Sequence, residues 1–156
     1  MFWEQFEAAA PALAARAREL FERSGVAVVG TIRSDGTPRI SCVEPSILDG
    51  ALYLGMMWRS RKAQDLLRDP RVVLRNAVCT SAGDEVELNL RGRVVDVRDP
   101  ELRRRFVEAV AERTRWEEPA FHLFSLDVES ASLVRYGHGR QSVQLWPQGT
   151  ELTRPY

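Results

Sequence analysis

The sequence predicts a mainly β domain, a β-barrel with flanking helices. Three observations support this fold class. Short runs rich in β-branched residues recur along the chain, tight turn sequences separate them, and helical patterns are few. The helices do not alternate regularly with the strands, as they would in a doubly wound parallel sheet. We therefore expect about six to seven antiparallel strands in a barrel, with helices packed outside it.

The first expected element is a helix over residues 3–23, in an N-terminal segment (1–24) that packs on the barrel. Its apolar side chains fall on one face at spacings of three and four. They are Phe6, Ala10, Leu13, Ala17, Leu20 and Phe21. Ser24-Gly25 ends the helix, because glycine readily takes the left-handed conformation that follows a last turn.

Three strand-like runs follow, joined by short turns. They extend from Val26 to Ile32, from Arg39 to Glu44 and from Ala51 to Met57. Ser34-Asp35-Gly36-Thr37 and Leu48-Asp49-Gly50 have the composition of tight turns. Consecutive strands with short connections predict an antiparallel meander.

A short helix then interrupts the strands. Ser60 is a good N-cap, and Asp69-Pro70 ends the helix because proline restricts the residue before it. A strand is expected from Arg71 to Val78, with a loop at 81–84.

The next strand is long, from Glu85 to Val97, and one face of its first half is apolar. Val86, Leu88 and Leu90 alternate with polar residues, which predicts one buried and one polar face. Gly92, between two arginines, marks a bulge or bend in this strand.

The last third contains one helix and the remaining strands. Asp99-Pro100 opens a helix that continues to about Arg113. The remaining strand-like runs, separated by turns, are Phe121 to Val128, Ala131 to Tyr136 and Gln141 to Trp146. A polar tail follows Pro147-Gln148-Gly149.

Composition limits the classes of function. The 156 residues fit a single domain, 1–156, and 22 basic residues balance 22 acidic ones. A chain without net charge is not expected to bind nucleic acid or an anionic membrane. No apolar run reaches the length of a membrane span, and the N-terminus lacks the pattern of a signal peptide.

The cysteines and histidines do not suggest a metal site. Cys42 and Cys79 lie in apolar strand-like runs, where we expect buried, unreactive thiols. Two cysteines without a disulfide framework suit a reducing compartment, so a cytoplasmic location is expected. His122 and His138 are far from each other and from the cysteines, and we assign no metal.

Lys62 is the only lysine among the 22 basic residues. It follows Ser60 and Arg61 at the start of the expected short helix. A helix start offers unpaired N–H groups and a positive dipole end, and both lysine and arginine bind phosphate. These residues therefore form a candidate phosphate site, although for an isolated Ser-Arg-Lys two solvated charges in a first turn are the commoner interpretation.

Four pieces of sequence around this point resemble one known family. They are Thr31-Ile32-Arg33 with Asp35-Gly36-Thr37-Pro38, Arg39-Ile40-Ser41-Cys42-Val43, Leu52-Tyr53-Leu54-Gly55 running into Ser60-Arg61-Lys62-Ala63, and Leu67-Arg68-Asp69-Pro70-Arg71-Val72. In order and spacing they resemble the split β-barrel family of pyridoxamine-phosphate-oxidase-like proteins. The match covers about a third of the chain, from Val26 to Leu74.

The resemblance implies a homodimer with two identical cofactor sites at the subunit interface. Ser60, Arg61 and Lys62 match the residues that clamp the cofactor phosphate in that family. Arg39, Ile40 and Ser41 match the start of the strand that lies along the ring system. Gly55 and Met56 match the positions at the ring edge. Met57 and Trp58 would cover the ring or pack in the protein; the sequence favours neither.

The resemblance favours an FMN-binding oxidoreductase acting on a small molecule. The alternative cofactor is the deazaflavin coenzyme F-420, for whose anionic tail Arg59 and Arg75 are candidates. The C-terminal sequence does not match the substrate-binding pattern of authentic pyridoxamine-phosphate oxidases, so we do not expect that reaction. A non-catalytic flavin carrier or sensor is the alternative of another class, because no catalytic dyad is recognisable and the catalytic residues are unknown. A dimeric scaffold without a ligand and a heme-binding protein are less favoured.

Overall fold

The computed structural model describes residues 1–78, 85–111 and 120–155. The described residues form four helices: α1 (Trp3–Ala9), α2 (Pro11–Ser24), α3 (Arg61–Arg68) and α4 (Pro100–Ala111). They also form nine strands: β1 (Ala27–Ile32), β2 (Pro38–Val43), β3 (Pro45–Leu48), β4 (Ala51–Met57), β5 (Arg71–Asn76), β6 (Val86–Asp96), β7 (Phe121–Gly137), β8 (Arg140–Trp146) and β9 (Thr150–Pro155). The predicted loop at 81–84, Cys79 and the predicted helix end at Arg113 lie outside the described residues.

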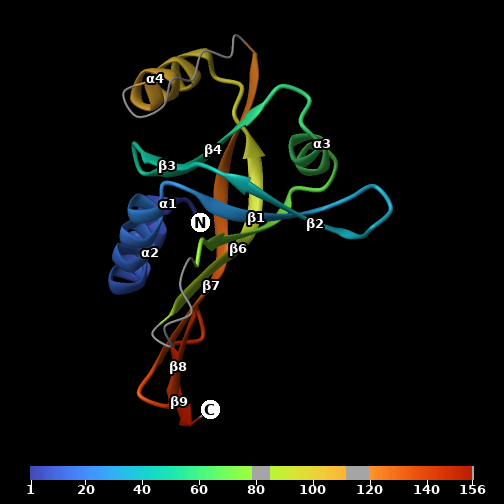
Figure 1. The fold of residues 1–156 in the computed structure, drawn as a ribbon. Coiled ribbons are helices and arrows are strands. Elements are labelled where there is room, and N and C mark those ends of the chain that lie inside the picture. The colour runs from blue at the N-terminus through green and yellow to red at the C-terminus, as the bar shows by residue number, and fades with distance from the viewer. Residues whose placement is uncertain (79–84, 112–119, 156) are drawn as a thin grey trace.

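All nine strands belong to one antiparallel sheet. Its order is β2-β1-β5-β6-β7-β4-β3, and β8 and β9 extend it from the far part of β7. β7 is the longest strand, and Figure 1 shows α4 near one of its ends and the β8–β9 hairpin at the other. The predicted class, mainly antiparallel β with flanking helices, is confirmed.

The predicted meander is wrong. β1 and β2 form a hairpin, but β4 pairs with β3 and β7 instead of β2. The reason is the short strand Pro45–Leu48, whose partner across the Asp49-Gly50 turn is β4. This strand has only four residues and begins with proline, so its sequence looked like the margin of a longer strand.

The predicted single N-terminal helix is two helices. Ala10 has φ −144° and ψ 63°, which separates α1 from α2, and Pro11 is the first residue of α2. Proline at this point has no N–H for the preceding turn and pushes the residue before it out of the helical region. The apolar stripe nevertheless packs as expected, with Phe6, Leu13 and Phe21 all buried.

The bulge predicted at Gly92 is confirmed. The register between β6 and β7 shifts between Arg91 and Gly92. A Cβ atom at Gly92 would lie 1.9 Å from the backbone oxygen of Asp127. The close approach of the two strands therefore requires a residue without a side chain.

The C-terminal third differs from the prediction in two ways. The two runs predicted on either side of residue 129 form one continuous strand, β7. The predicted polar tail includes β9, which pairs with β8 along its length. Its residues are almost all exposed, so β9 carries no apolar alternation that a sequence pattern would reveal.

Two apolar clusters hold the helices to the sheet. The larger one joins α1, α2 and α3 to the buried face of the sheet, and includes Trp3, Phe124, Leu54 and Leu66. The smaller one lies under α4 and contains Tyr53, Val97, Phe106, Val110, Phe121 and Leu123. β4 and β7 thus contribute buried side chains to both clusters.

Candidate functional site

A groove of about 210 Å³ opens between β2 and β4 at the first turn of α3. Its lining is mostly apolar, with a cation and a carboxylate: Val26, Cys42, Val43, Glu44, Gly55, Met56, Met57 and Lys62. Three of the eight predicted cofactor residues, Gly55, Met56 and Lys62, line it. An elongated ligand with an apolar body and an anionic end would match this lining.

Lys62 is held at the groove by β2. Its Nζ donates a hydrogen bond to the backbone oxygen of Cys42. Burial lowers the pKa of the Lys62 ammonium, and the neighbouring Cys42 and Glu44 oppose that shift. A half-buried ammonium that has no carboxylate in hydrogen-bond contact among the described residues is suited to receive an anion, which would favour its charged form.

Ser60 occupies the predicted N-cap position of α3 but does not cap the helix. Its side chain makes no capping hydrogen bond, and its Oγ atom is buried without a hydrogen-bond partner among the described residues. A buried hydroxyl without a partner is costly and rare in folded proteins. Next to it, Arg61 is exposed. The first turn of α3 therefore combines a buried hydroxyl that has no partner among the described residues, an exposed guanidinium, and an ammonium whose hydrogen bond goes to a backbone oxygen.

The predicted residues on β2 divide between the two faces of the strand. Arg39 turns toward α3, where its Nε donates to the Oδ2 of Asp65 at 2.6 Å. Ile40 lies on the other face with 77% of its surface exposed, and Ser41 is half-buried. None of the three lines the groove, which is bordered by the next part of the strand, Cys42 and Val43.

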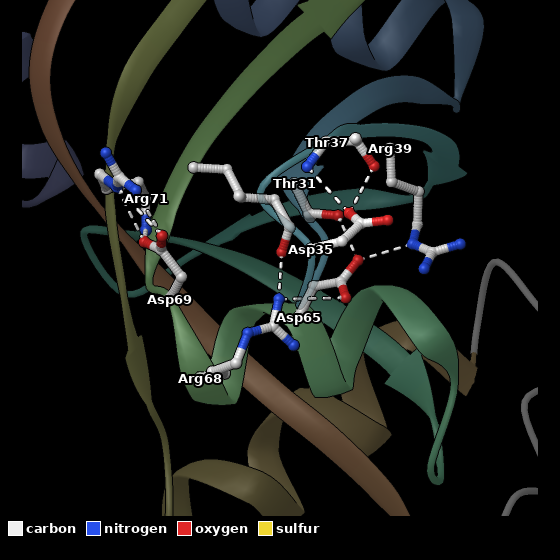
Figure 2. A network of polar contacts seen from close by, with 9 residues as sticks. Thr31, Asp35, Thr37, Arg39, Asp65, Arg68, Asp69 and Arg71 are labelled. Carbon is white, nitrogen blue, oxygen red and sulfur yellow. Dashed lines mark hydrogen bonds and ion pairs between the residues drawn. The ribbon is translucent and has the colours of Figure 1, made fainter.

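Asp65 is the centre of the network that fastens α3 to the β1–β2 hairpin (Figure 2). The carboxylate accepts hydrogen bonds from Thr31 Oγ1 at 2.9 Å and from Arg39, and Arg68 lies 3.5 Å from its other oxygen. Burial alone would raise the pKa of this carboxyl, but the bonds from Arg39 and Thr31 and the guanidinium charges lower it below its usual value. Asp65 is therefore a buried, charged and fully engaged group.

The strand end at Met56, Met57 and Trp58 combines a buried and an exposed part. Met56 is fully buried in the larger core, whereas Met57 and Trp58 are 59% and 52% exposed. The Trp58 ring stacks on the His122 imidazole, with centroids 4.5 Å apart and an angle of 12° between the planes. Met57 lines the groove and is available to a ligand ring, while Trp58 is engaged by β7.

Sequence reasoning missed Cys42 and Glu44 as groove residues. The prediction that Cys42 is buried is wrong: the thiol is exposed. Ile40 and Cys42 are both exposed on the same face of β2, which is the last strand of the sheet order in the described residues. The structure shows exposed and half-buried residues alternating from Pro38 to Cys42, but apolar Ile40 and Cys42 on the exposed face gave the sequence no signal of it.

The histidines are not groove residues. His122 is buried on β7 behind Trp58, and His138 is exposed in the turn between β7 and β8. Within 1–78, 85–111 and 120–155, no group of three or more His, Cys, Asp or Glu residues is placed to hold a metal ion. No helix in the described part of the chain has the length and apolar character needed to cross a membrane.

Comparison with known proteins identifies the family. The family model described as pyridoxamine 5'-phosphate oxidase matches residues 13–135. No curated protein matches the chain.

Solved structures share the fold. A heme-binding protein from Mycobacterium smegmatis superposes with a TM-score of 0.67 at 23% identity, covering 86% of this chain and 58% of that one. The heme storage protein HutZ from Vibrio cholerae has a TM-score of 0.64 at 19% identity, and the match covers 80% of this chain and 95% of that one. A putative pyridoxamine 5'-phosphate oxidase from Listeria innocua has a TM-score of 0.60 at 19% identity, and the match covers 76% of this chain and 95% of that one. These likenesses show the fold. The family model, which matches most of the chain, shows that the chain belongs to the pyridoxamine 5'-phosphate oxidase-like split-barrel family.

Proposed function

We propose that the protein binds FMN in the groove between β2 and β4 and acts as a flavin-dependent oxidoreductase on a small molecule. The observation that carries this proposal is the unsatisfied first turn of α3. The buried Ser60 Oγ lacks a hydrogen-bond partner among the described residues, and the half-buried Lys62 ammonium lies at the end of an apolar groove. A phosphate would satisfy both groups, and the apolar lining would cover a ring system.

The bound flavin would supply the hydride chemistry, and the chain would supply anchoring and orientation. Ser60, Arg61 and Lys62 would hold the phosphate. Gly55 would let a flat ring approach the β4 backbone, because it has no side chain, and Met57 would pack against the ring. Reaction with pyridoxamine phosphate itself is not part of the proposal, since the C-terminal residues form the β8–β9 hairpin and do not match the vitamin-binding pattern.

The groove is proposed to be completed by a second copy of the chain. Large apolar side chains are exposed on the elements that border it: Ile40 at 77% on β2, Met57 at 59% on β4 and Trp58 at 52% just after it. Exposed apolar residues in one region favour a protein interface over free solvent. Sedimentation of the purified protein should give a homodimer.

Two related proposals differ in the cofactor. The deazaflavin F-420 is supported by exposed Arg59 and Arg61 near the phosphate position, whereas Arg75 is already paired with Glu87 at 2.8 Å. Heme is the other alternative cofactor, because two structural neighbours are named as a heme-binding protein and a heme storage protein. Neither described histidine lines the groove, so its lining favours a flavin over heme.

The test compares FMN with riboflavin, which has the same ring and no phosphate. FMN should bind at least tenfold more tightly, the size expected for one or two charge-assisted hydrogen bonds (about 1.5–3 kcal/mol each). Lys62→Ala should remove most of this difference, whereas Arg104→Ala, which removes an exposed cation from α4, should leave it intact. Equal affinity for FMN and riboflavin would contradict the phosphate site.

Absorbance and mass spectra of protein purified from its own host would identify the cofactor. A bound flavin that is reduced and then reoxidises no faster than free FMN would favour a carrier or sensor over an enzyme. A heme spectrum in freshly purified protein would overturn the flavin proposal.

A further inference from the structure

The turn between β4 and α3 is fastened to β7 by a single imidazole. His122 Nε2 accepts a hydrogen bond from the backbone N–H of Arg59 at 3.2 Å. The same ring stacks on Trp58, the residue before Arg59, and lies 6.2 Å from the Phe124 ring on its own strand. Two successive residues of the turn therefore contact His122, which is 63 positions away from Arg59 in sequence.

This turn determines where the candidate phosphate ligands stand. Arg59 has φ 54°, a left-handed conformation that a residue with a side chain adopts only when its surroundings hold it there. Ser60 follows directly, and its N–H donates to the Met57 oxygen at 3.1 Å to close the turn. If Arg59 relaxed, Ser60 and the start of α3 would change direction relative to the groove.

The contact depends on the protonation state of His122. Nε2 accepts a hydrogen bond only while it carries no proton, because the imidazolium has two N–H donors and no acceptor. A proton on Nε2 would face the Arg59 N–H. Two other charged groups act on the ring: Asp96 at the end of β6 favours the imidazolium, and Arg103 on α4 disfavours it. Burial is the largest effect, and the net result is that the pKa of His122 is lowered from its ordinary value.

We propose that His122 is a positioning residue whose neutral imidazole holds the β4–α3 turn in the conformation that presents Ser60, Arg61 and Lys62 to a phosphate. Protonation of His122 releases the turn and weakens phosphate binding. The effect on the ligand rests on the proposed function, whereas the coupling between His122 and the turn is a property of the free protein.

Two variants separate the contribution of the His122 hydrogen-bond acceptor from that of its aromatic ring. His122→Gln keeps a hydrogen-bond acceptor that does not titrate, and His122→Phe keeps an aromatic partner for Trp58 without an acceptor. FMN affinity is measured for each at about pH 7.5 and about pH 5, on either side of the ordinary range of histidine. Circular dichroism confirms that each protein remains folded at both values. The dissociation constant of the wild type for FMN is divided by that of His122→Gln at the same pH. This ratio cancels the effects on binding of the titration of the FMN phosphate and of other residues.

The expected results follow from losing one hydrogen bond. The ratio of wild-type to His122→Gln dissociation constants should rise about fivefold from pH 7.5 to pH 5. His122→Phe should bind FMN about fivefold more weakly than wild type at pH 7.5. A ratio that stays constant down to a pH at which the NMR signal of the His122 ring has passed its midpoint would overturn the proposal.

A measurement on the free protein distinguishes this inference from the proposed function. In NMR titrations the Arg59 amide signal should shift with the same midpoint as the His122 ring, and in His122→Gln that shift should disappear. If FMN fails to bind while the Arg59 amide still follows His122, the proposed function is wrong and the control of the turn by His122 stands. If the NMR signal of the Arg59 amide does not change when His122 is protonated, the inference is wrong, whether or not FMN binds.

Discussion

The two sides of α3 differ in how their polar groups are satisfied. Toward the β1–β2 hairpin, the buried Asp65 carboxylate has three partners, and Arg68 also donates to the Ile32 oxygen (Figure 2). At its first turn, the Ser60 hydroxyl has no partner among the described residues, and Lys62 reaches one backbone oxygen. The same short helix is thus anchored through its middle and left open at its N-terminal end.

The contrast separates stability from binding. A buried charge with every oxygen engaged contributes through the fold, and its loss leaves partners unpaired. An unsatisfied hydroxyl beside a desolvated ammonium costs stability and becomes useful only when a ligand arrives. We call the Asp65 contacts together with the β6–β7 bulge the framework, and expect framework variants to change unfolding and first-turn variants to change affinity.

Gly92→Val should give the largest effect and should act on the framework alone. The new side chain would collide with the Asp127 backbone oxygen, which has no room to move within the β6–β7 pairing. We expect a loss of about 4 kcal/mol or more, or failure to fold. Val95→Ala, an exposed position on the same strand, should change stability by less than about 1 kcal/mol in urea unfolding. Wild-type stability of the Gly92 variant would refute the bulge.

Asp65→Ala should destabilise the protein by about 2–4 kcal/mol. It leaves the Thr31 hydroxyl and the Arg39 Nε without their partner. Asp69→Ala, at the residue that follows the same helix, is the control, since Asp69 forms a more exposed pair with Arg71 and should matter much less. If both variants unfolded alike, Asp65 would have no special part in anchoring α3.

The lowered pKa of Asp65 also predicts how the stability of the protein changes as the pH falls. Its pKa in the folded protein lies below the ordinary value of 3.8, so its contribution is complete above that value and is lost as the pH falls through the lowered pKa. Asp65→Asn should remove this part of the pH dependence. The free energy of unfolding of both proteins in urea is measured between about pH 5 and pH 3. If it falls equally with pH in both, protonation of Asp65 makes no contribution to the pH dependence of stability.

Local patterns were enough to predict the elements around α3. Ser60 and Lys62 were proposed because a strand-like run, a helix start and a lone lysine occur together, and the bulge at Gly92 was predicted because a regular alternation is interrupted there. These signals depend only on neighbours in sequence. The short strand β3 and the exposed strand β9 carry no such signal, since their pairing depends on strands already in place.

The contacts that organise the site were not predictable in the same way. Arg39 was expected along a cofactor ring, yet it meets Asp65, 26 residues later, because α3 docks beside the β1–β2 hairpin. His122 reaches Arg59 only because β4 pairs with β7. Cys42 is exposed on β2, at the end of the sheet order. In each case the surroundings of the residue are set by tertiary structure, which local sequence does not determine.

Lys62→Ala should change FMN affinity rather than stability, the opposite of what is expected for the framework variants. FMN affinity should fall by about 1–3 kcal/mol, the cost of losing a hydrogen bond to a charged group, with little change in unfolding. Calorimetric titration with FMN, using Arg104→Ala as the control for a lost exposed cation, measures the effect. An unchanged affinity would remove Lys62 from the site.

The Lys62 ammonium also predicts a pH dependence of binding. Because burial lowers its pKa, FMN binding should weaken as the pH rises through a value below the ordinary 10.5 of lysine. Riboflavin, which has no phosphate, should bind without this dependence. The same decline for both ligands would assign the effect to another group.

Ser60→Ala should have the smallest effect and the most specific one, because stability and affinity should move in opposite directions. Removing a buried hydroxyl that has no partner among the described residues relieves its desolvation, so the free protein should be unchanged or more stable by up to about 1 kcal/mol. The same change removes a donor to the phosphate, so FMN affinity should fall by about 0.5–1.5 kcal/mol while riboflavin affinity stays constant. Ser24→Ala is the matched control, since the Ser24 hydroxyl already donates to the Val26 oxygen at 2.7 Å and its loss should only destabilise. A Ser60 variant that is less stable and binds FMN normally would show that the hydroxyl serves the fold, and the distinction between the two sides of α3 would then be wrong.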